Sequence, residues 1–244
     1  MHGTDGAGGG PGESEESVAE RRLHAGVVLY DAGEYHAAHD PWEAHWLALA
    51  DREDTPEDGT ERRFFQGLVQ TTAAVYHARR GNWTGATGLA AGALGYLDGL
   101  GETYRGVALA PVRQYLEALA ADPEVVERGP PVRLTVAGRA LDPADLPFDA
   151  LVLAVEALVE EYALDGAMVE RAVEFARADL DEGRATSPFV ALLYDLVEGR
   201  NRGLVVRRLG EHVDRREHRE SDVAGLFDVG GGGDEGEGES QREH

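Results

Sequence analysis

Apolar residues recur at every third or fourth position along most of the chain, which is the spacing of an α-helix with one buried face. The first such run places Leu23, Val27 and Tyr30 on one face, and Gly33 then ends it. Ser187-Pro188 is a helix-starting pair, because serine caps a helix and proline suits its first turn. The pattern predicts helices over 17–31, 61–80, 83–100, 111–121, 147–162, 166–182, 188–198 and 203–219, with a further helix ending before Asp51.

These elements predict an all-α fold with an antiparallel helical bundle over 17–121 and a second helical subdomain over 147–228. Residues 122–146 are rich in helix breakers and are predicted to be a linker. Within it, residues 132–141 alternate like one short β-hairpin turning at Ala137-Gly138. The ends, 1–16 and 229–244, are made of Gly, Ser, Asp and Glu with little to bury, so we expect them to be disordered.

The stretch Tyr35–Trp46 holds the densest chemistry, with three histidines, two carboxylates and two tryptophans. On a helix, His39, Asp40 and Glu43 share one arc beside an apolar arc. Pro41 leaves two readings of the local structure. In one, Asp40 is an N-cap, Pro41 is the first helical residue and Glu43 completes a capping box. In the other, a kinked helix begins near Glu34.

A second polar stripe lies in the predicted helix 61–80. Arg63, Gln66, Gln70 and His77 stand at offsets of three, seven and fourteen, which keeps them on one helix face. We expect this stripe to face the arc of His39 on a neighbouring helix. Together they would line a site or form a hydrogen-bonded network.

The composition narrows the classes of partner. The 244 residues carry 46 acidic and 23 basic side chains, a formal charge of −23, and every basic residue is arginine. This charge opposes binding to nucleic acid or anionic membranes. It is typical of cytoplasmic proteins from salt-accumulating organisms, in which salt screens the self-repulsion.

There is no cysteine, so any metal would rest on His, Asp and Glu. We see neither a signal peptide nor a span long enough to cross a bilayer. We therefore expect a cytoplasmic protein that binds neither nucleic acid nor membrane.

The ordered motifs resemble one family. Gly33-x-Tyr35-x-x-Ala38-His39-Asp40-x-Trp42-Glu43-x-x-Trp46 is followed by Arg63-x-x-Gln66-Gly67-Leu68-Val69-Gln70, His77 and Gly81-Asn82-x-x-Gly85-Ala86. This set resembles the small all-helical domain-of-unknown-function family 309 over about residues 21–100. The resemblance implies a helical domain of a family loosely described as predicted metal-dependent hydrolases. It highlights eight residues: His39, Asp40, Glu43, Arg63, Gln66, Gln70, His77 and Asn82.

The sequence also departs from the family pattern. Where the family usually shows Glu-Ala-His-Glu, this chain has Ala37-Ala38-His39-Asp40, and Pro41 is unusual there. One carboxylate is therefore missing from the pattern and another is shortened. These changes weaken a metal site, and we expect His36 and His45 to compensate only in part.

Three functional hypotheses follow. In a metal-dependent hydrolase, His39, Glu43 and His77 would bind a divalent metal such as zinc or manganese. Asp40 would be a further ligand or a general base, and Arg63 would stabilise negative charge on the substrate.

In the second hypothesis the same residues form a structural network, in which Glu43 pairs with Arg63, and the glutamines and His77 satisfy the remaining groups. In the third, the chain is a helical interaction module that binds a protein partner or a second copy of itself. The two Gly-Glu/Asn-aromatic openings at Gly33 and Gly81 are 48 residues apart, which does not match the repeat of about 34 residues of tetratricopeptide arrays.

Overall fold

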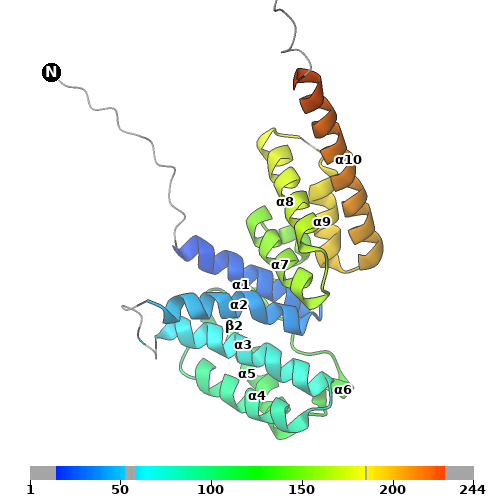
Figure 1. Ribbon diagram of the computed structural model, residues 1–244. Coiled ribbons are helices and arrows are strands. Elements are labelled where there is room, and N and C mark those ends of the chain that lie inside the picture. The colour runs from blue at the N-terminus through cyan, green and yellow to red at the C-terminus, as the bar shows by residue number, and fades with distance from the viewer. Residues whose placement is uncertain (1–14, 53–55, 57–58, 185, 229–244) are drawn as a thin grey trace, which may run out of the picture.

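A computed structural model describes residues 15–52, 56, 59–184 and 186–228, without the side chains of 15, 16 and 223–228. The described chain is all-α, as predicted, with one small antiparallel sheet (Figure 1). The helices are α1 (Glu15–Asp31), α2 (Tyr35–Ala50), α3 (Thr60–Arg79), α4 (Trp83–Leu97), α5 (Leu109–Ala121), α6 (Val125–Arg128), α7 (Phe148–Glu161), α8 (Gly166–Asp181), α9 (Pro188–Glu198) and α10 (Arg202–Asp228). A 3₁₀ turn spans Pro143–Asp145.

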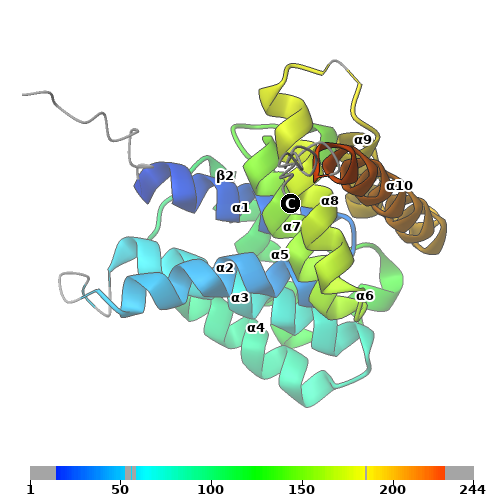
Figure 2. The same ribbon diagram turned by 45° about the horizontal axis from the view of Figure 1, so that its top comes forward.

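Consecutive helices pack on one another in the first half of the chain. Figures 1 and 2 show α1, α2, α3 and α4 in the same succession from two directions, and each packs on the next. Helix α7 packs on both α1 and α2 and also on α8 and α9, so it joins the two groups of helices. Buried apolar side chains from α1 to α10 form one continuous cluster.

The helix boundaries follow local signals. The Ser187 hydroxyl accepts a hydrogen bond from the backbone N–H of Val190, Pro188 is the first residue of α9, and Gly199 ends this helix with a φ of 78°. These are the residues that favour a helix start and a left-handed end. Within the part of the chain that the structure describes, no helix combines the length and apolar character needed to cross a bilayer.

The predicted disordered ends lie almost entirely outside the described residues. Residues 1–14 and 229–244 are not described. Residues 15 and 16 belong to α1, which therefore begins two residues earlier than the predicted start at 17.

Pro41 lies inside α2, so the reading of Asp40 as an N-cap is wrong. The helix begins at Tyr35, and Glu34 is the capping residue, without a side-chain cap hydrogen bond. Proline lacks the N–H that would bond to the carbonyl of Ala37. Its ring is buried instead, so packing in the core compensates for the lost hydrogen bond.

Trp42 fixes α2 against α1. Its side chain is fully buried, and its indole N–H donates to the carbonyl oxygen of Leu23 at 3.2 Å. Gly26 allows this approach, because a Cβ there would lie 2.2 Å from Nε1 of Trp42. The buried pair explains why α1 and α2 are held so closely.

The predicted hairpin at 132–141 is reduced to its turn. Ala137 and Gly138 both have positive φ, and Val136 and Arg139 form a single bridge across them. The described two-stranded sheet is instead β1 (Thr103–Tyr104) with β2 (Val107–Ala108). The backbone around Val136 instead forms hydrogen bonds with the β1–β2 hairpin, where the N–H of Ala137 donates to the carbonyl of Gly106 at 2.8 Å. Residues 132–141 therefore do not form the longer hairpin that was predicted.

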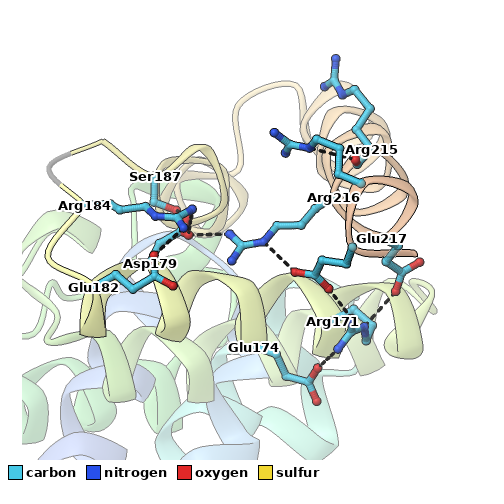
Figure 3. A network of polar contacts seen from close by, with 11 residues as sticks. Arg171, Glu174, Asp179, Glu182, Arg184, Ser187, Arg215, Arg216 and Glu217 are labelled. Carbon is cyan, nitrogen blue, oxygen red and sulfur yellow. Dashed lines mark hydrogen bonds and ion pairs between the residues drawn. The ribbon is translucent and has the colours of Figure 1, made fainter. Parts of the chain in front are cut away.

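One buried carboxylate ties the last three helices together (Figure 3). Asp179 of α8 is 2% exposed and accepts hydrogen bonds from Arg184 at 2.8 Å, Ser187 at 2.7 Å and Arg216 at 2.5 Å. Burial raises the pKa of Asp179. The hydrogen bonds from Arg216 and Ser187 and the charges of the two arginines together lower it by more, so the pKa of Asp179 lies below its ordinary value. The carboxylate is thus held ionised where α8, the start of α9 and α10 meet.

A matched pair of glycine substitutions tests the contact between α1 and α2. Gly26→Ala places a methyl group on the Trp42 ring and should lower the free energy of unfolding by about 1–3 kcal/mol. Gly88→Ala in α4 meets open space and should raise it by up to about 1 kcal/mol, because alanine favours a helix. Urea unfolding of both variants measures the difference, and equal effects would contradict the close approach.

Candidate functional site

The residues of the predicted metal site on α2 form a small cluster at the surface. His39 is 30% exposed, and its Nδ1 lies 3.5 Å from a carboxylate oxygen of Glu43 and 3.8 Å from one of Asp40. The neighbouring carboxylate of Asp40 raises the pKa of His39, burial opposes this, and the charge of Glu43 adds to the rise. The arc expected from the sequence is therefore present, with its carboxylates gathered around His39.

Arg63 turns away from this cluster. Its guanidinium donates to the carbonyl oxygens of Asp98 at 2.6 Å and Gly95 at 3.3 Å, which lie at the end of α4. The last carbonyls of a helix have no partner within the helix, so a charged donor there completes the helix end. The predicted pairing of Glu43 with Arg63 is wrong for this reason.

His77 and Asn82 lie together at the N-terminal end of α4, opposite the end that Arg63 contacts. The side-chain amide of Asn82 lies 2.7 Å from Nδ1 of His77, and its oxygen accepts the backbone N–H of Gly85 at 3.1 Å. Asn82 is thereby the N-cap of α4, held by a side chain of α3.

The two glutamines lie between these ends. Gln70 is directly against α4, because a Cβ at Gly92 would lie 2.1 Å from its Oε1. The Oε1 of Gln66 is buried, and among the described residues it has no hydrogen-bond partner. The stripe of Arg63, Gln66, Gln70 and His77, which we call the α3 stripe, therefore shares one helix face as predicted.

The α3 stripe faces α4. The prediction that this stripe faces His39 is therefore wrong. Helix α3 lies between α2 and α4, and its contacts with each use different faces. Helical periodicity shows which residues share a face but not which neighbour that face meets. The structure thus brings together His39, Asp40 and Glu43 in one place, and Arg63, Gln70, His77 and Asn82 along another.

Among the described residues, no group of three or more His, Asp or Glu side chains is arranged to hold a metal ion. His77, one of the three predicted ligands, has its Nδ1 beside Asn82. Of the three predicted ligands, His39 and Glu43 thus lie together on α2, and His77 lies at the contact between α3 and α4.

A buried ionic contact that the sequence analysis missed joins α2 to α3. His45 is 6% exposed, and its Nε2 lies 3.0 Å from Oε1 of Glu61. Arg105 donates to the same oxygen at 2.7 Å. The His45 hydrogen bond lowers the pKa of Glu61 to about 2; burial opposes this, and the hydrogen bond and charge of Arg105 add to the lowering.

Only part of this contact left a signal in the sequence. His45 lies on the buried arc of α2 between Trp42 and Leu49, where a histidine needs a polar partner. Arg105 comes from the turn of the β1–β2 hairpin and has a positive φ of 45°. No spacing rule links that turn to Glu61, which is 44 residues away.

Comparison with known families gives one match. Residues 23–89 match the sequence model of a domain of unknown function, DUF309. This range covers the second half of α1, all of α2 and α3, and about the first half of α4. No curated protein matches the chain.

The hydrogen bonds of Glu61 make the stability of the fold depend on pH. Because the folded pKa of about 2 lies below the ordinary 4.5, the ionised carboxylate stabilises the fold above pH 4.5 and loses this effect as pH falls toward 2. Glu61→Gln should lower the free energy of unfolding at pH 7 by about 1–3 kcal/mol, and the difference from the parent protein should narrow between these pH values. Urea unfolding across this range measures it, with the exposed Glu170→Gln as a control expected to stay within about 0.5 kcal/mol.

Two adjacent arginines test the orientation of the α3 stripe. Arg63→Met removes two hydrogen bonds to the end of α4 and should lower the free energy of unfolding by about 1–3 kcal/mol. Arg62→Met removes a guanidinium that lies 5.6 Å from the Trp46 ring centre and should cost about 0.5–1 kcal/mol. Urea unfolding of both variants measures the difference. An equal decrease in the free energy of unfolding for the two variants would contradict this geometry.

Proposed function

We propose, from the premise that residues 23–89 belong to the DUF309 domain family, that this chain is a non-catalytic helical binding module. In this proposal the α3 stripe and Asn82 hold α3 on α4 and take no part in a reaction. The bundle then acts as a rigid support for a surface that binds a ligand or partner.

The observation that carries the proposal is the environment of Arg63. A guanidinium that stabilises a reacting group must point at the place where negative charge develops. Arg63 already donates to two carbonyl oxygens that belong to a helix end. Moving it to a substrate would leave those carbonyls without a partner, at a cost comparable to a lost hydrogen bond.

The positions of the histidines support the same proposal. His39 lies beside two carboxylates of its own helix, and the side chain of His77 lies against the cap of α4. Metal-dependent hydrolysis needs ligands from several positions that converge on one ion and leave it an open coordination site. We therefore derive no reaction step through a metal.

The acidic composition supports a proposed setting for this module. With 46 acidic against 23 basic residues and no lysine, we propose that it works in a salt-rich cytoplasm and does not bind nucleic acid. The Asp and Glu excess keeps such a surface hydrated and limits nonspecific association.

Metal analysis tests the proposal directly. Protein made without a histidine tag is incubated with zinc or manganese, freed of excess metal and measured by mass spectrometry. The His39→Ala, Glu43→Ala double variant is measured beside it. The matched control is His218→Ala with Asp222→Ala, since this pair has the same i, i+4 spacing on the surface of α10 and a separation of 3.6 Å.

The proposal predicts equal and substoichiometric metal in all three proteins. One equivalent of metal in the parent protein that is lost with His39 and Glu43, and kept in the control, would instead support the hydrolase hypothesis. That result would justify a screen of ester and phosphoester substrates.

A further inference from the structure

A small cleft lies where the start of α2, the end of α3 and the end of α7 meet. Its volume is about 250 Å³. The lining residues come from 33–36, 76–80 and 161–162, so the cleft combines two segments of the family domain with one from α7. Ligand pockets for drug-sized molecules measure about 300–1,000 Å³, so this cleft suits a smaller ligand or one headgroup.

Two neighbouring arginines line this cleft without a carboxylate partner. Arg79 and Arg80 are both exposed, and within the described residues neither forms an ion pair. Each guanidinium lies over an aromatic ring: that of Arg80 is 4.5 Å from the centre of Tyr76, and that of Arg79 is 5.7 Å from the centre of Tyr35. Contact with a ring face leaves the N–H groups at the guanidinium edge available to an anion.

The two carboxylates that line the cleft have other polar partners. Glu34 accepts hydrogen bonds from Arg202 at 2.9 Å and from the hydroxyl of Tyr162 at 2.7 Å. Glu161 lies 2.6 Å from Nδ1 of His36. Within the described residues, neither carboxylate therefore forms an ion pair with Arg79 or Arg80.

This arrangement is unusual in a chain with a formal charge of −23. Elsewhere in the described chain, most arginines pair with a carboxylate or donate to a backbone carbonyl, as Arg177 does with Asp149 at 2.7 Å. Arginines in the last turn of a helix also offset the helix dipole. That effect requires neither a cleft nor two supporting tyrosines, so it does not explain the whole arrangement.

We propose that this cleft binds the phosphate group of a small phosphorylated ligand, with Arg79 and Arg80 as its anion-binding residues. Adjacent guanidinium groups match the oxygens of a phosphate, and each can donate two hydrogen bonds in parallel. Tyr35 and Tyr76 hold the arginines in place through these ring contacts. The volume and the overall negative charge argue against a nucleic acid chain.

The inference rests on the proposed function in one respect, namely that the module binds a ligand, and its test does not depend on metal. The probe is methylenediphosphonate, which resists hydrolysis and carries two phosphate-like groups. The full chain is titrated in buffer containing a metal chelator, and binding is followed by calorimetry and by amide NMR shifts. A hydrolase that needs a metal would be silent here, so the two proposals can fail separately.

Three single variants decide the outcome. Arg79→Gln and Arg80→Gln should each weaken binding by about tenfold, since each removes one charge-assisted contact. Arg177→Gln is the matched control, because it also lies over an aromatic ring, Phe148, but is already paired with Asp149. It changes the net charge equally and should alter affinity less than about twofold.

The expected result is saturable binding with NMR shifts gathered at residues 33–36, 76–80 and 161–162. Absence of saturable binding up to about 10 mM would overturn the proposal. Equal weakening by all three variants would overturn it as well, because it would assign the effect to net charge. Unchanged thermal unfolding of the variants verifies that they remain folded.

Discussion

The contact between α3 and α4 is the constraint on which the arrangement of polar residues depends. Arg63 completes the C-terminal end of α4, while His77 contacts the residue that caps its N-terminal end. Both ends of α4 would otherwise leave backbone groups without partners. By supplying donors and acceptors at these two points, α3 sets the position of α4 along its own length as well as its distance.

Because the α3 stripe is committed to α4, a different face of α3 is left for α2. There Glu61 bonds to His45, and Phe65 packs on the same imidazole with ring centres 4.3 Å apart. On its other side α2 packs on α1, where Trp42 of α2 lies against Gly26 of α1. The start of α2 and the end of α3 consequently lie together against α7, and this junction forms the cleft that contains Arg79 and Arg80.

Much of the secondary structure could be predicted from the sequence, because its signals are local. The bounds of α9 follow from Ser187, Pro188 and Gly199, and the α3 stripe was placed on one face correctly. The position of Pro41 was undecided because its burial compensates for a missing hydrogen bond, and burial is a tertiary property. The neighbour of the α3 stripe and the approach of Arg105 to Glu61 depend on how distant segments pack, so spacing along the chain could not reveal them.

The most direct test of this account is native-state hydrogen exchange of the parent protein and Arg63→Met. If Arg63 holds the end of α4, exchange should accelerate in the amides of the last turn of α4 and the residues just after it, and α2 should keep its protection. Acceleration in α2 around His39 and Glu43, with α4 unchanged, would contradict the account. It would place Arg63 with that cluster and return the polar residues to a shared site.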